Sequence, residues 1–69
     1  MRELYRATDN GIVFRKIGDK LPEMYSYKSQ EWVQNTAAID AFYEGNDTYM
    51  VTKEEAEKII ADTSKRIRT

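Results

Sequence analysis

The sequence predicts an α+β domain: a three-stranded antiparallel meander, extended to four strands if residues 49–51 pair, with a short helix and a C-terminal amphipathic helix packed on one face. Two runs of aromatic and β-branched residues flank an Asn-Gly turn near the start of the chain, as in a β-hairpin. An apolar stripe at helical spacing follows a capping signal near the end. The 69 residues suit one domain spanning 1–69.

Residues 2–8 and 12–17 are expected to pair around Thr8-Asp9-Asn10-Gly11, because Asn and Gly tolerate positive φ. The favoured register places Ala7 opposite Ile12, Tyr5 opposite Phe14 and Glu3 opposite Lys16. It gathers four apolar side chains on one face. A slip by one residue would place Arg15 among them and is therefore disfavoured, whereas a two-residue loop would keep the same faces.

A third strand is expected at residues 24–28, after the turn signals of residues 18–23. Its alternation directs Tyr25 and Tyr27 to the same face. Residues 29–35 are interpreted as a connection anchored by their tryptophan. The meander thus reaches three strands, about the minimum for an independent sheet.

A short helix is expected at residues 36–44, with Asn35 or Thr36 as its N-cap and Gly45 as its stop. Its apolar positions at helical spacing are Ile39, Phe42 and Tyr43. Residues 49–51 then form a brief extended stretch that can pair with the sheet edge.

The final helix is expected from Lys53 to about Arg66, because Thr52-Lys53-Glu54-Glu55 matches a capping box. Its apolar stripe, which should cover the sheet, consists of Ala56, Ile59, Ile60, Thr63 and Ile67. The predicted core consists of Tyr5, Ile12, Phe14, Ile39, Phe42, Ile59 and Ile60.

The composition argues against several classes of function. With 11 basic and 12 acidic residues the net charge is −1, so no overall field attracts nucleic acid or an anionic membrane. The absence of Cys and His removes disulfides, the usual zinc ligands and the usual catalytic groups. We therefore expect no enzyme, metal or cofactor. The charged N-terminus and the lack of a long apolar run predict a cytoplasmic protein without membrane contact.

Asp40, Glu44 and Asp47 are the densest acidic group and suggest a weaker hypothesis, a carboxylate or metal-dependent enzyme. Their spacing lacks the ligand run of a calcium loop. A solvated helix end followed by an acidic turn is the commoner meaning of such a pattern.

The second face of the hairpin is the leading functional candidate. In the favoured register it carries Leu4, Arg6, Val13, Arg15 and Ile17. This mixture of apolar and basic side chains is typical of a protein contact, and small domains without disulfides or metals often need association for stability. We predict a protein-interaction module that self-associates as a homo-oligomer or docks on a larger partner. The alternative is that Leu21, Trp32 or residues 18–23 fold over this face.

Single-stranded nucleic-acid binding is the alternative function. Its contacts would be Arg15, Tyr25, Tyr27 and Lys28. Tyrosine rings can stack on bases while basic side chains meet phosphates. The net charge and the absence of the ribonucleoprotein aromatic signature argue against nucleic acid as the partner.

Three features follow one another along the chain. They are a tyrosine-rich hairpin, then Glu31-Trp32-Val33, then Gly45-Asn46-Asp47 leading to Val51-Thr52-Lys53-Glu54-Glu55-Ala56. This order resembles that of short uncharacterised bacterial proteins found in phage-like or mobile regions. The resemblance spans most of the chain and implies the same α+β order. It implies no activity, so no functional residue is transferred from it.

Overall fold

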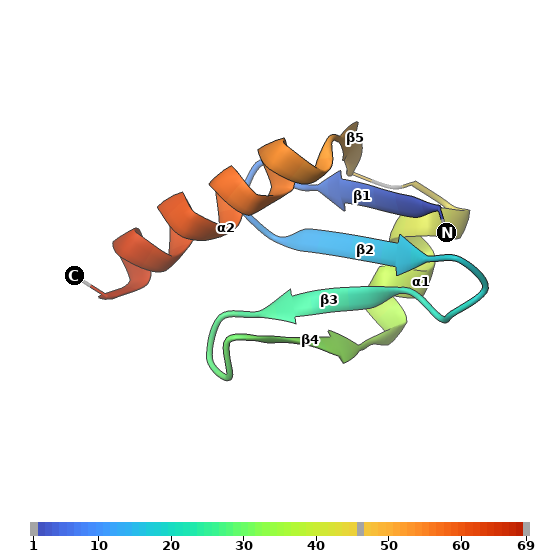
Figure 1. Ribbon diagram of the computed structural model, residues 1–69, viewed down its shortest axis with the longest axis horizontal. Helices are drawn as coiled ribbons and strands as arrows, with labels where there is room; N and C mark the ends of the chain where they lie inside the picture. The colour runs from blue at the N-terminus through green and yellow to red at the C-terminus, as the bar shows by residue number, and fades with distance from the viewer. Residues whose placement is uncertain (1, 46, 69) are drawn as a thin grey trace.

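In the computed structural model, which describes residues 2–45 and 47–68, five antiparallel strands form one sheet with a helix on each face (Figure 1). The elements in chain order are β1 (Glu3–Ala7), β2 (Val13–Ile17), β3 (Glu23–Ser26), β4 (Glu31–Gln34), α1 (Thr36–Tyr43), β5 (Tyr49–Val51) and α2 (Lys53–Arg68). The strand order across the sheet is β4-β3-β2-β1-β5. The predicted α+β class is therefore confirmed.

The predicted strand count is too low, because a strand lies where the sequence predicts a connection. Strand β4 pairs with β3 and places Trp32 opposite Tyr25. The turn before β4 ends with Gln30, whose φ of 58° is usually adopted by Gly or Asn. The sequence therefore carries no ordinary turn signal at this point. The short stretch at residues 49–51 does pair with β1, as β5.

The predicted hairpin register is wrong by one residue, and the shift changes both faces of the sheet. Tyr5 lies opposite Arg15 rather than Phe14, and Ala7 lies opposite Val13. The prediction assumed that a helix covers only one face. Because α2 packs on one face and α1 on the other, each face requires its own apolar residues, and adjacent Val13 and Phe14 supply them.

Two apolar clusters hold the layers together. The cluster under α2 consists of Tyr5, Ala7, Val13 and Ala56, with Trp32, Val51, Ile59 and Ile60 packed against it. The cluster under α1 consists of Phe14, Ala38 and Ala41, with Met24 and Phe42 packed against it. The sheet is thus the middle of three layers.

The predicted core is correct for its aromatic centre and wrong at the turn. Tyr5 and Phe14 are buried, whereas Ile12 is 37% exposed because the shifted register leaves it before β2. The other predicted core residues are half-buried; they are Ile39, Phe42, Ile59 and Ile60. Four alanines that the predicted core leaves out are buried: Ala7, Ala38, Ala41 and Ala56.

Helix α2 begins at the predicted capping box. The Thr52 hydroxyl accepts a hydrogen bond from the Glu55 amide at 3.1 Å, and the Glu55 carboxylate accepts one from the Thr52 amide at 2.9 Å. Ala56 and Thr63 of its stripe are buried. The helix then runs past the end of the sheet (Figure 1), so Ile67 is 60% exposed. Across residues 2–45 and 47–68, every helix is too short or too polar to cross a membrane.

Candidate functional site

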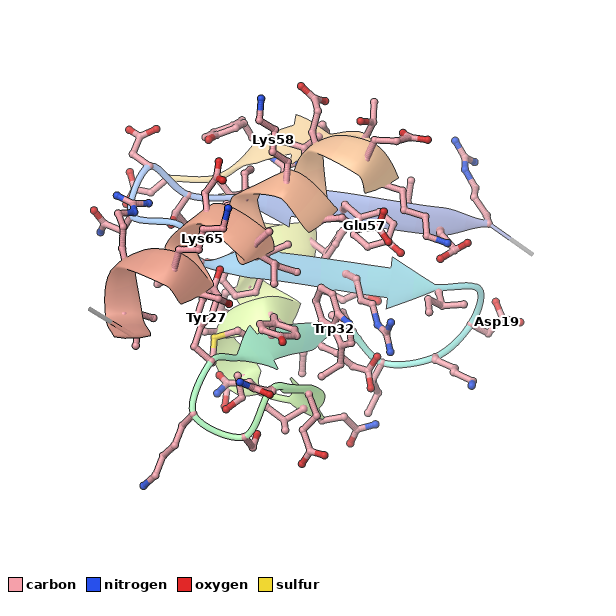
Figure 2. The ribbon with its side chains drawn as sticks, turned by 60° about the vertical axis from the view of Figure 1, so that its left-hand side comes forward. Asp19, Tyr27, Trp32, Glu57, Lys58 and Lys65 are labelled. Carbon is pink, nitrogen blue, oxygen red and sulfur yellow. The ribbon has the colours of Figure 1, made fainter. Side chains whose placement is uncertain are left out.

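The sheet face that carries α2 is covered on one half. Helix α2 packs on β1 and β2, and Figure 2 shows Trp32 beside this helix rather than beneath it. Beside the helix lie half-buried side chains that we call the aromatic platform: Arg15, Glu23, Tyr25, Tyr27 and Trp32. Tyr27, at the edge of the platform next to α2, contacts Thr63 of that helix. The described residues form no pocket, and the platform side chains are partly exposed.

The rings of the platform form a continuous series of edge contacts. The Trp32 ring centroid lies 5.3 Å from that of Tyr25 and 6.3 Å from that of Tyr5. The Tyr25 centroid lies 5.1 Å from that of Tyr27. Rings attract one another in such edge-to-face arrangements. The Tyr27 hydroxyl also donates a hydrogen bond to the Gly11 carbonyl, which joins the series of rings to the hairpin turn.

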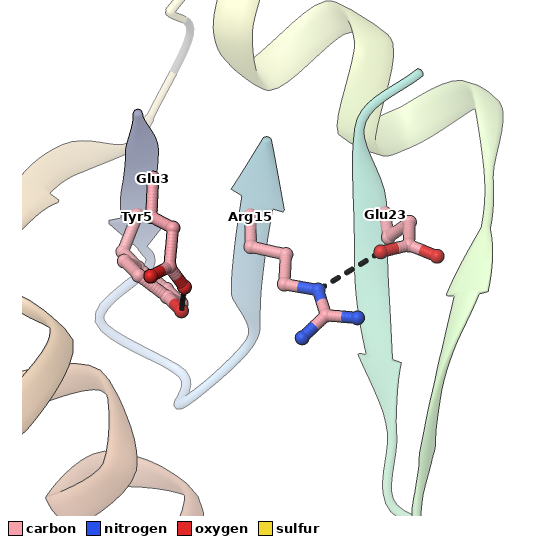
Figure 3. Close-up of polar contacts among 4 residues, drawn as sticks. All are labelled: Glu3, Tyr5, Arg15 and Glu23. Carbon is pink, nitrogen blue, oxygen red and sulfur yellow. Dashed lines mark hydrogen bonds and ion pairs between the residues drawn. The ribbon is translucent and has the colours of Figure 1, made fainter. Parts of the chain in front are cut away.

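Two contacts hold Arg15 over the platform. Its Cζ lies 4.4 Å from the Trp32 ring centroid, a cation–π arrangement. Its Nε donates to Glu23 Oε1 at 2.9 Å (Figure 3), and these two side chains are 24% and 26% exposed. The terminal nitrogens of Arg15 form no hydrogen bond with the described residues. The guanidinium is therefore fixed in place with its outer edge open.

Two further carboxylates lie near Tyr5, the residue opposite Arg15 on β1. The Tyr5 hydroxyl donates to Glu3 at 2.8 Å (Figure 3). Burial, and then the hydrogen bond to Glu3, raises the pKa of Tyr5 to about 12, and the charge of Glu57 on α2 adds to the rise. Glu3 also lies 4.0 Å from the Lys53 ammonium. Together with Glu23, three carboxylates and two cations share this surface, so it has no excess of positive charge.

The five residues predicted as an interface do not share a face, so the predicted surface is wrong. Leu4 and Arg6 lie on the α1 side, while Val13, Arg15 and Ile17 lie on the α2 side. Val13 is fully buried. Arg6 donates from Nε to the Thr48 hydroxyl at 2.7 Å and from a terminal nitrogen to the Thr48 carbonyl at 2.9 Å. The register shift is the cause, and only Arg15 belongs to the platform.

Three of the four residues predicted for nucleic-acid contact lie on the platform: Arg15, Tyr25 and Tyr27. Lys28 is exposed in the turn between β3 and β4. Glu23 and Trp32 also belong to the platform, although neither was predicted as a site residue. The alternation of Glu31-Trp32-Val33-Gln34 is the signal that could have placed Trp32 next to Tyr25.

The predicted acidic group does not form a metal site. Asp40 is exposed on α1, Glu44 follows the end of that helix, and Asp47 is exposed with a φ of 57°. Within residues 2–45 and 47–68, no group of three acidic side chains is arranged to hold a metal ion. No acidic cluster in these described residues therefore supports the hypothesis of a metal-dependent enzyme.

No family model, curated protein or solved structure matches this chain. The fold and the platform define a small three-layer α+β domain with a partly exposed, aromatic half-face.

Proposed function

We propose that this chain is a non-enzymatic protein-interaction module, located in the cytoplasm, whose contact surface is the aromatic platform. The observation that carries the proposal is the position of Arg15, which stacks on Trp32 and pairs with Glu23 beside α2. Tryptophan, tyrosine and arginine are the residues that contribute most to protein–protein binding. Here all three types are in contact on one half-face.

The small size of the buried side chains supports the proposal. Among the described residues, four of the seven buried apolar side chains are alanines, and the largest fully buried ones are Val13 and Pro22. The accessible surface of 4953 Å² exceeds by roughly a tenth the value of about 4,500 Å² expected for a monomer of 8.1 kDa. A partner that covered the half-buried rings would add the apolar burial that the isolated domain lacks.

Single-stranded nucleic-acid binding stays the second candidate, because Arg15, Tyr25 and Tyr27 share the platform with Trp32. Stacking surfaces for bases combine such rings with an excess of cations along the path of the phosphates. This platform instead has one carboxylate beside its arginine and two more near Tyr5, and phosphates would be repelled by them. A protein partner, which can offer charges of both signs, fits the surface better.

Site-specific photo-crosslinking tests the proposal. Tyr25 is replaced by p-benzoylphenylalanine, which keeps an aromatic ring on the platform, and the protein is irradiated in its host cytoplasm. The control carries the same group at Asp40, which is exposed on α1, on the opposite face of the sheet. We expect a discrete protein adduct, with this chain or another, from position 25 and none from position 40. Equal labelling at both positions, or none at position 25, would refute the proposal.

Fluorescence of Trp32 tests the second candidate. Short single-stranded oligonucleotides are titrated at low salt, and a base stacked on the platform would quench the single tryptophan. Phosphate contacts would also make the affinity fall steeply as salt rises. We expect no quenching. Salt-sensitive quenching that is lost in R15Q would replace the protein-interaction proposal with nucleic-acid binding.

A further inference from the structure

We propose that the occupant of the aromatic platform is a second copy of this chain, bound face to face about a two-fold axis that passes beside the Arg15–Glu23 pair. This inference rests on the proposed function and specifies the partner. In such a dimer each contact occurs twice, because residue i of one copy meets residue j of the other and the reverse. The platform must therefore be complementary to itself.

The charges of the platform meet this requirement. Arg15 uses only Nε on Glu23 Oε1, so its terminal nitrogens and the second carboxylate oxygen of Glu23 have no hydrogen-bond partner among the described residues (Figure 3). A two-fold axis beside this pair brings Arg15 of each copy to Glu23 of the other. Two antiparallel ion pairs then share four charges of alternating sign. A partner with a single sign of charge would leave either Arg15 or Glu23 facing a like charge.

The shape of this face is also complementary to itself. Helix α2 rises above β1 and β2, whereas β3 and β4 beside it form the half of the same face that α2 does not cover (Figures 1 and 2). A two-fold axis that runs along the strands places α2 of each copy over β3 and β4 of the other. Trp32 and Tyr25 then lie in the interior of the contact, where aromatic rings contribute most to affinity.

An interface of standard size would use only part of the accessible surface. A stable contact buries about 800 Å² on each partner, roughly a sixth of the 4953 Å² that this chain exposes. Because alanines make up much of the buried apolar set, this added burial would be a large share of the total. A domain that associates with itself gains this apolar burial without any other protein being present.

Charge exchange between copies tests the inference. Sedimentation of the purified full chain is measured over a concentration series for the wild type, R15E, E23R, an equimolar mixture of the two variants, and the double variant R15E/E23R. The control is D40K, which changes the net charge as E23R does but lies on α1, on the opposite face of the sheet. Circular dichroism of every variant verifies the fold.

We expect the wild type and D40K to form dimers, and R15E or E23R alone to weaken dimerisation by about thirtyfold or more, since like charges then meet across the axis. The mixture should form a heterodimer, and R15E/E23R should form a homodimer again. Dimers that persist in both single variants, or a mixture that stays monomeric while both variants are folded, would overturn the inference.

A wild type that is monomeric at the highest concentration would also overturn the inference. In that case an adduct from position 25 with a different protein would leave the proposed function standing. If position 25 formed no adduct either, both proposals would fail. The two experiments therefore separate the choice of partner from the choice of surface.

Discussion

Replacing Gly11 with alanine should destabilise the protein more than any ordinary turn substitution, because this glycine lies where α2 meets the hairpin. Gly11 has a φ of +88°, and a Cβ atom added there would lie 2.5 Å from Thr63 Oγ1 and 3.3 Å from Thr63 Cγ2. Real Cβ atoms essentially never approach other atoms to 2.5 Å. The turn or the helix must therefore move.

The expected cost of G11A combines two effects. A left-handed backbone with a side chain costs about 1–2 kcal/mol, and forcing α2 away from the turn costs about 1–3 kcal/mol, as overpacking does. A total of about 3 kcal/mol would lower the melting temperature by roughly 12–24 °C in a domain of this size. Thermal and urea unfolding followed by circular dichroism measure both quantities.

Gly45 provides the matched control. Its φ is +69°, but an added Cβ would meet only an Arg6 terminal nitrogen at 3.6 Å, an ordinary contact. G45A should therefore show the backbone cost alone, about 1–2 kcal/mol. G11A/T63A should recover part of the loss of G11A, because alanine at position 63 lacks both atoms that the new Cβ meets. If G11A costs no more than G45A, α2 does not rest on the hairpin turn as described.

Substitutions at three further positions test other contacts. Folding raises the pKa of Tyr5 from 10.0 to about 12, so its neutral form stabilises the fold below pH 10 and this stabilisation is lost as the pH rises through 12. Melting temperatures over that interval should fall more steeply for the wild type than for Y5F, and equal slopes would contradict the assignment. T52A should cost about 1 kcal/mol in urea unfolding while T52S costs only a few tenths; equal losses would exclude the capping box. R6K should remove one of the two bonds to Thr48 and speed amide exchange in β5 by about fivefold, as expected for about 1 kcal/mol. Unchanged exchange would show that Arg6 does not hold this loop.

The helices and their ends were predictable because their signals lie within a few residues. Asn35 caps α1 by accepting a hydrogen bond from the Ala37 amide at 2.8 Å, and Gly45 follows that helix with a positive φ. The α2 capping box forms as its residues indicate. Short polar caps act through neighbouring backbone groups, so their effect does not depend on the rest of the fold.

The candidate site was only partly predictable. Arg15, Tyr25 and Tyr27 were singled out from their residue types, but the platform also needs Glu23 and Trp32. Trp32 lies on β4. The turn before this strand ends with Gln30, a residue type that does not usually indicate a turn. Glu23 becomes the partner of Arg15 only through the pairing of β2 with β3. Both omissions concern residues whose importance depends on a neighbouring strand.

The sequence by itself determined the α+β class, the existence of the hairpin, and the positions and caps of both helices. Only the tertiary structure decided the hairpin register, and with it which side of the sheet each side chain reaches. Side chains alternate along a strand, so a shift of one residue exchanges the two faces. Here apolar residues are needed on both faces, because α1 covers one and α2 half of the other. The need for apolar residues on both faces arises only when the three layers pack together. The register that satisfies it places Arg15 next to Trp32 on the same face.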